Sequence, residues 1–196
     1  MSVISKSTLL ENRNKTRTFS KSITDSLSEF KKETSAGKTT IFLSHKHDEL
    51  AELDSAVSFL KRFGVNIYVD WLDTGMPKNT SGKTAKRIKD KIDECDKFIL
   101  LATESAIASK WCNWELGYGD AKRYDRNIAI FPIRNDGDSF SGSEYLQIYP
   151  RIESIQSNTI SRKIGGYFDG GYYVISPTDE DGYSYYTKLE EWLSRR

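Results

Sequence analysis

Short apolar stretches alternate with amphipathic stretches from Thr39 onward, and this alternation limits the possible folds more than any other feature of the chain. The apolar stretches of strand length are TTIFLS, VNIYVDW, KFILLAT and NIAIFPI. Between them, residues 47–64, 83–96 and 109–124 repeat apolar side chains every three or four positions, which predicts helices. Strands that are apolar on both faces require helices on both sides of a parallel sheet. The sequence therefore predicts an α/β fold.

Two parts of this pattern are less regular. The helix over residues 109–124 is predicted to be irregular because it contains two glycines. After Arg134 the chain is richer in loops, and we predict a fifth strand at YYVIS, residues 172–176. A closing helix is predicted from three aromatic or apolar residues that share one helical face, namely Tyr185, Leu189 and Trp192.

Residues 1–38 differ from the rest because they are rich in Ser, Thr and Lys. We interpret them as a polar N-terminal arm, and residues 39–196 as the folded domain. One amphipathic helix is predicted within the arm, and it can pack on the main domain or on a second copy. Its apolar residues are Phe19, Ile23, Leu27 and Phe30.

Charge and hydropathy exclude several classes of protein. Lys and Arg number 29 against 28 for Asp and Glu, and no long basic block occurs, so no nucleic-acid partner is expected. No apolar run reaches the roughly 18–20 residues of a membrane span, and Met1 is not followed by a basic leader with an apolar core. We expect a soluble, cytoplasmic protein without a membrane partner. Cys95 and Cys112 are predicted to be reduced thiols in the core.

In parallel α/β sheets, ligands bind beyond the carboxyl ends of the strands. This rule selects the segments that follow the first three strands, and the start of the helix that follows the third. That helix places Glu115 four residues after Trp111, so both side chains project from one face. A carboxylate beside an indole can stabilise a positively charged sugar through charge and cation–π attraction. The spacing alone, however, favours a simpler interpretation, an aromatic-rich helix start with an exposed glutamate.

Other catalytic or binding motifs are incomplete. GMPKNTSGKT resembles a P-loop in its second half, Gly82-Lys83-Thr84, but Pro77 stands near the place where the first glycine is required. A P-loop NTPase is therefore disfavoured. No G-x-G-x-x-G follows any strand, which also disfavours a dinucleotide on a Rossmann loop.

His45 and His47 form an H-x-H pair that can bind metal, yet no third ligand is predicted near them, so no metal is expected. Ser44, His45 and Asp70 could be drawn as a catalytic triad, but the G-x-S-x-G elbow is missing. Polar loop residues are the favoured interpretation of both groups.

Read in order, IFLSHKHDE, IYVDWLDTGMP, FILLATESAIASKWCNWEL and NIAIFPI resemble a TIR domain. The resemblance is to the bacterial branch that includes NAD-consuming TIR proteins of Thoeris-type anti-phage defence. It covers residues 39 to about 134 well and residues 135–196 loosely. It implies a flavodoxin-like TIR fold, with a five-stranded parallel sheet and helices on both faces. In this family the loop after the second strand, which includes residues 75–84, mediates self-association and shapes the active cleft.

The resemblance also implies roles for individual residues. Glu115 corresponds to the catalytic glutamate, and Trp111 to an aromatic wall beside it. The other implied substrate-binding residues are Ser44, His45, Lys46, Asp70, Trp71 and Lys83. The substrate implied is NAD+, with no separate cofactor and no metal. The implied partners are a second copy of the chain and an effector protein that reads the product.

A single glutamate is compatible with this chemistry. The nicotinamide of NAD+ is already cationic and leaves as a neutral molecule, so no proton donor is needed, unlike in most glycosidases. We therefore expect an NAD+ glycohydrolase or cyclase that releases nicotinamide and forms linear or cyclic ADP-ribose as a signal in antiviral defence. Two alternatives stay open at this point. They are a non-catalytic TIR interaction module and an enzyme similar to nucleoside deoxyribosyltransferases.

Overall fold

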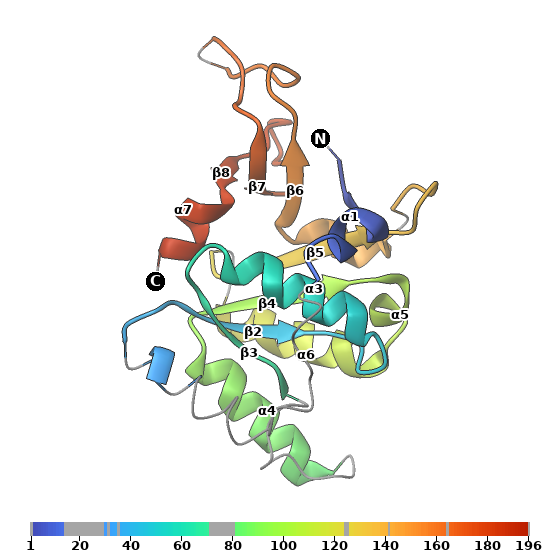
Figure 1. The fold of residues 1–196 in the computed structure, drawn as a ribbon, viewed down its shortest axis with the longest axis vertical. Helices are drawn as coiled ribbons and strands as arrows, with labels where there is room; N and C mark the ends of the chain where they lie inside the picture. The colour runs from blue at the N-terminus through green and yellow to red at the C-terminus, as the bar shows by residue number, and fades with distance from the viewer. Residues whose placement is uncertain are drawn as a thin grey trace.

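The computed structural model describes residues 2–13, 30, 32–34, 36–70, 81–123, 126–140, 142–163 and 165–195 (Figure 1). These residues form one mixed sheet with helices on both faces. The strands are β1 (Ile4–Ser5), β2 (Thr40–Ser44), β3 (Asn66–Tyr68), β4 (Lys97–Ala102), β5 (Ile128–Arg134), β6 (Arg151–Ile155), β7 (Gly171–Ile175) and β8 (Tyr186–Lys188). The helices are α1 (Lys6–Leu10), α3 (Leu50–Lys61), α4 (Gly82–Glu94), α5 (Glu104–Ile107), α6 (Lys110–Arg123), the 3-10 helix η2 (Glu144–Ile148) and α7 (Leu189–Ser194).

Five parallel strands follow one another across the sheet in the order β3-β2-β4-β5-β6, and the short strand β1 adds a further parallel pairing with β5. In β2, Ile41 lies opposite Ile67 of β3 on one side and opposite Lys97 of β4 on the other. This is the strand order of flavodoxin-like folds, in which ligands bind where the connections change from one face of the sheet to the other. The predicted fold class is therefore confirmed.

The sheet continues beyond β6 in a way that the sequence did not predict. The stretch YYVIS does form a strand, β7, but it pairs antiparallel with β6, and β8 pairs antiparallel with β7. The fifth parallel strand is instead β6, which lies in a segment of mixed polarity that includes Arg151 and Glu153. A parallel pairing of β6 and β7 would need a crossover, usually a helix, whereas an antiparallel pair needs only a loop. The described residues between them contain no helix.

The core is divided between the two faces of the sheet. Along β2, Ile41 and Leu43 point to one face and Phe42 to the other, as the two-residue period of a strand requires. The first face is covered by α1, α3 and α7, and the second by α4, α5 and α6. Both faces are apolar because both are covered, which explains the continuously apolar strands.

The N-terminal segment lies within the sheet. Ile4 of β1 lies opposite Ile133 in a parallel pairing with β5. On the other side, the backbone of Ser2 exchanges hydrogen bonds of 3.0 and 3.1 Å with Ser154 of β6. β1 thus fills the space where β6 diverges from β5 (Figure 1). The sequence pattern did not predict β1 or α1, and Leu9 of α1 is 1% exposed in the core.

The helix predicted in the N-terminal arm lies mostly outside the described residues. Of its apolar residues only Phe30 is described, and its ring packs edge-on against Tyr68 with 5.5 Å between centroids. The division of the chain at residue 38 stays a prediction.

Two helices differ from expectation. α6 is a continuous helix despite its glycines, so the prediction of an irregular helix was wrong. Gly119 allows α6 to approach the sheet, because a Cβ atom at this position would lie 2.8 Å from the Phe98 ring. In the closing helix, Leu189 and Trp192 are buried as predicted, but Tyr185 precedes β8 and is 69% exposed.

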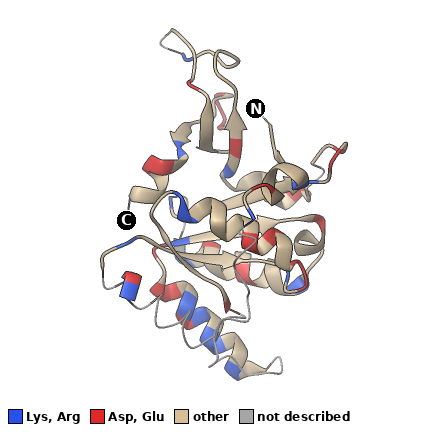
Figure 2. Cartoon of the chain, in the orientation of Figure 1, with Lys and Arg blue, Asp and Glu red and all other residues tan. Residues whose placement is uncertain are grey.

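Charged residues of both signs are spread over the molecule, and basic residues are most frequent along α4 (Figure 2). Even there, acidic neighbours offset them, as in the 2.7 Å ion pair between Lys86 and Asp90. None of the helices in the described ranges combines the length and the apolar character needed to cross a membrane.

Candidate active site

Three segments bring polar side chains together at the carboxyl ends of β2 and β3. Ser44 is the last residue of β2, and His45 follows it. Asp70 comes two residues after the end of β3. The N-terminal half of α6 lies against them, and Cys112 Sγ donates a hydrogen bond to the His45 carbonyl oxygen at 3.3 Å. This contact joins α6 to the loop after β2 and places Glu115, one turn further along α6, at the end of the sheet.

Glu115 is buried and held by one direct hydrogen bond. Its side chain is 2% exposed, and Ser44 Oγ donates to its Oε2 atom at 2.6 Å. The other carboxylate oxygen, Oε1, is buried and accepts no hydrogen bond from any described residue. The simpler interpretation, an exposed glutamate at a helix start, is therefore wrong. Buried polar atoms normally have partners, so the orphaned Oε1 is an acceptor available to a ligand.

The surroundings of Glu115 favour its protonated form. Burial raises the pKa of Glu115 well above the ordinary value, and the negative charge of Asp70 raises it further. The hydrogen bond from Ser44 and the nearby Trp111 indole act in the opposite direction and lower it. Carboxyl groups with strongly shifted pKa values are frequent at functional sites, because catalysis often requires a protonation state that the group would not have in water.

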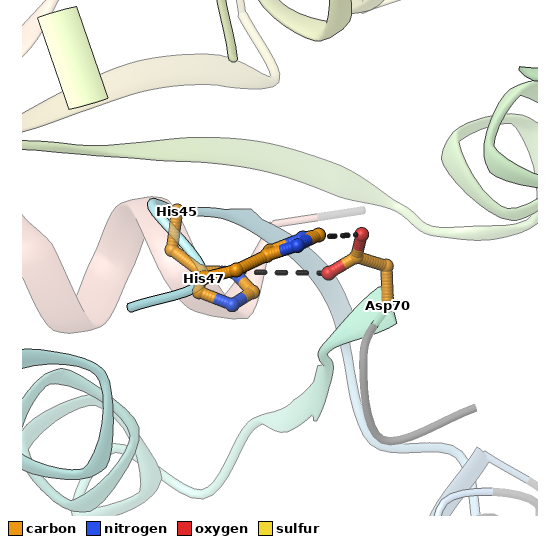
Figure 3. Close-up of side chains that lie close together, drawn as sticks. All are labelled: His45, His47 and Asp70. Atoms are coloured by element: carbon orange, nitrogen blue, oxygen red, sulfur yellow. Dashed lines mark hydrogen bonds and ion pairs between the residues drawn. The ribbon is translucent and has the colours of Figure 1, made fainter. Parts of the chain in front are cut away.

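Two imidazole rings flank Asp70 (Figure 3). His47 Nε2 lies 3.0 Å from Asp70 Oδ2, and His45 Nδ1 lies 3.9 Å from Asp70 Oδ1. His45 Nδ1 also lies 3.1 Å from the Leu43 carbonyl oxygen. Burial lowers the pKa of His45, whereas the hydrogen bond to Asp70 raises the pKa of His47. The sequence predicted no third ligand near the two histidines, but the fold brings Asp70 to both.

The remaining predicted site residues lie around this cluster or apart from it. Trp111 is half-buried and stacks on Trp114, with 4.9 Å between ring centroids. Lys46 Nζ lies 3.4 Å from Asp48 Oδ1 at the surface. Lys83 is exposed in the first turn of α4. Trp71 lies outside the described residues, as does the rest of the loop up to residue 80.

The P-loop-like segment has a structural explanation where it is described. Ser81 caps α4, and its side chain and that of Thr84 each accept a hydrogen bond from the other's backbone N–H, at 3.4 and 3.2 Å. This reciprocal arrangement is a capping box, which starts a helix without any ligand. Gly82 and Thr84 therefore belong to a helix N-terminus, and α4 begins one residue before the helix predicted from residue 83.

His47 is the residue of this cluster that the predicted site left out. Its spacing of two residues from His45 was the only available signal, and that spacing does not reveal a partner 23 positions away. Cys112 was correctly predicted to be a core thiol. Burial raises the pKa of the Cys112 thiol to about 11, so it is not poised as a nucleophile at neutral pH.

Comparison with known families matches residues 41–160 to the TIR domain. The chain is 29% identical over 116 residues to a Bacillus cereus (strain MSX-D12) protein named "Probable 3' cyclic ADP-D-ribose synthase ThsB'", covering 57% of this chain and 59% of that protein. It is 20% identical over 117 residues to a Cytobacillus dafuensis protein named "Putative cyclic ADP-D-ribose synthase TIR2". The second match covers 52% of this chain and 31% of that protein. The chain thus spans less than two thirds of the length of either relative.

Proposed function

The chain belongs to the TIR domain family, and we propose that it cleaves the bond between nicotinamide and ribose in NAD+. The products are nicotinamide and ADP-ribose in cyclic or linear form. The printed names of both relatives describe synthesis of cyclic ADP-D-ribose, which supports this choice of substrate.

The buried Glu115 carboxyl group is the observation that carries the proposal. An acid used only for docking partners would lie at the surface, whereas Glu115 is 2% exposed and has one orphaned oxygen. This burial favours an enzyme over a non-catalytic interaction module.

Glu115 acts as an electrostatic stabiliser rather than as an acid in this mechanism. Ser44 holds Oε2, which leaves Oε1 to accept hydrogen bonds from the ribose hydroxyl groups. The carboxylate stabilises the positive charge that develops on the ribose as the bond to nicotinamide breaks. Nicotinamide leaves as a neutral molecule, so no proton has to be supplied. The Trp111 ring forms the wall beside the sugar.

The nucleophile that follows determines the product. Water gives linear ADP-ribose, whereas a hydroxyl group or adenine nitrogen of the same molecule gives a cyclic product. Exclusion of water favours the second outcome. His45 and Asp70 line the cleft at the sheet end in this proposal, and the loop residues contribute outer contacts through Lys46, Trp71 and Lys83.

The biological role is proposed on the same basis. The protein works in the cytoplasm as part of antiviral defence, assembles with further copies of itself through its TIR surfaces, and releases a product that a separate effector protein reads. Assembly is expected to govern activity, because closure of the cleft by a second copy excludes water from the ribose.

Incubation of the purified chain with NAD+, followed by chromatography of the products, tests the proposal. Wild type is expected to release nicotinamide, with assays repeated over a range of protein concentrations to allow assembly. Glu115→Gln keeps the shape of the side chain but removes its charge, and should lower the rate about 100-fold or more. Glu190→Gln is the matched control, because Glu190 is an exposed glutamate in α7 and its loss should leave the rate unchanged. Equal rates in wild type and Glu115→Gln, or no nicotinamide at any concentration, would contradict the proposal.

A further inference from the structure

The His45, His47 and Asp70 side chains have the composition and spacing of a metal site. One potential ligand atom from each residue can be chosen so that all three atoms lie within 4.8 Å of one another (Figure 3). We propose that these three residues bind a single Zn²⁺ ion. The proposal does not rest on NAD+ cleavage, because the ligand set alone defines it.

The ligand types favour Zn²⁺ over the common hard cations. Two imidazole nitrogens and one carboxylate oxygen, with a remaining position for water, form a frequent ligand set for zinc. Mg²⁺ and Ca²⁺ instead prefer sites made of oxygen atoms. The chain contains only two histidines, so both are used in this site.

The donor atoms are already placed close to one carboxylate. His47 Nε2 is 3.0 Å from Asp70 Oδ2, and His45 Nδ1 is 3.9 Å from Asp70 Oδ1. His45 Nδ1 also faces the Leu43 carbonyl oxygen at 3.1 Å, so an ion bound at Nδ1 replaces that hydrogen bond. The ring proton then lies on Nε2, which is buried and has no hydrogen-bond partner among the described residues. The His47 side chain is 54% exposed, which gives an ion a route from solvent to the buried Asp70.

The local charge balance also favours a cation. Asp70 and Glu115 are both buried, and each charge disfavours the other. A dication bound to Asp70 compensates the buried negative charge of both carboxylates.

Metal binding is tested with the full chain, purified without a histidine tag. Equilibrium dialysis with Zn²⁺ is expected to give one ion per chain, and Co²⁺ as a spectroscopic probe should give the visible absorption bands of a four- or five-coordinate site. Mg²⁺ and Ca²⁺ should not displace Co²⁺. A thiolate-to-metal charge-transfer band would place the ion on a cysteine instead and would overturn the proposal.

Variants identify the ligands. His47→Gln and Asp70→Asn should each weaken Zn²⁺ binding by more than about 10-fold, since loss of even an outer partner of a metal ligand costs roughly 10–100-fold. Asp90→Asn is the matched control, because Asp90 is 50% exposed and pairs with Lys86 on α4, outside the site. If Asp70→Asn does not fold, the test depends on His47→Gln, which should fold because the His47 side chain is half exposed. Absence of stoichiometric binding, or unchanged affinity in His47→Gln, would refute the site.

Discussion

Ser44 and Glu115 are 71 positions apart in the chain, yet the Ser44 hydroxyl group donates a 2.6 Å hydrogen bond to the Glu115 carboxylate in the protein interior. This bond favours the ionised form of Glu115, whereas the nearby charge of Asp70 favours the protonated form. The two neighbours therefore act on the same proton in opposite directions. The two effects on the pKa of Glu115 can be measured separately, because a single substitution removes either the Ser44 hydroxyl group or the Asp70 charge.

The pH dependence of NAD+ cleavage should move in opposite directions in two variants. The proposed mechanism requires ionised Glu115, so the rate should fall with decreasing pH as Glu115 takes up a proton, above the ordinary glutamate pKa of about 4.3. Asp70→Asn removes a charge that raises the pKa and should shift this acid limb to lower pH. Ser44→Ala removes a bond that lowers the pKa and should shift it to higher pH. Profiles of kcat/KM against pH measure both shifts, and a shift in the same direction would contradict this assignment.

Glu115→Gln should stabilise the protein at neutral pH while it abolishes activity. The raised pKa of Glu115 means that the folded state binds this proton more tightly than the unfolded state. Stability from this group is therefore present at acid pH and is lost as the pH rises from about 4.3 to the folded-state value. Glu115→Gln has no group to titrate and therefore avoids this loss. Each 1 kcal/mol gained in the free energy of unfolding should raise Tm by roughly 2–4 °C for a domain of this size. Thermal melts from acid to neutral pH measure it, and a constant difference at all pH values would argue against a titrating Glu115.

The two glycines of α6 should respond oppositely to alanine. Gly119→Ala puts a Cβ atom 2.8 Å from the Phe98 ring, so we expect a loss of about 1–3 kcal/mol from overpacking. At Gly117 a Cβ atom meets no atom within 4 Å, and alanine should stabilise the helix by about 1 kcal/mol. Urea unfolding of both variants gives the free energies of unfolding. Equal effects would mean that α6 does not approach β4 as closely as described.

Leu9 should contribute to the stability of the whole domain. Leu9 is 1% exposed in the same core cluster as Phe131, so Leu9→Ala should lower the free energy of unfolding by about 2–5 kcal/mol. Leu10 is only half-buried in the same helix, and Leu10→Ala should cost about 1 kcal/mol. Denaturant titration compares the two. Should both changes be neutral, the N-terminal segment is not part of the cooperative unit.

The parallel part of the fold could be predicted because its strands are apolar on both faces. That pattern marks β2, β3, β4 and β5 individually and leaves little choice of architecture. β6 escaped prediction because it carries Arg151 and Glu153. β1 escaped because two residues carry no periodicity, and its pairing depends entirely on distant strands.

The candidate site could be predicted residue by residue but not as a set of contacts. The strand-end rule and the Trp111–Glu115 spacing selected the right segments. Spacing cannot show that Glu115 is buried or that both imidazoles lie close to the Asp70 carboxylate, because these facts depend on how α6 packs across the ends of β2 and β3. The three proposed metal ligands therefore come together only in the folded structure.

The position of β1 has a consequence for synthesis on the ribosome. Ile4 pairs beside Ile133, so β1 is translated well before β5, the strand with which it pairs. β1 must therefore wait while β2, β3 and β4 emerge, and it can join the sheet only after β5 has left the exit tunnel.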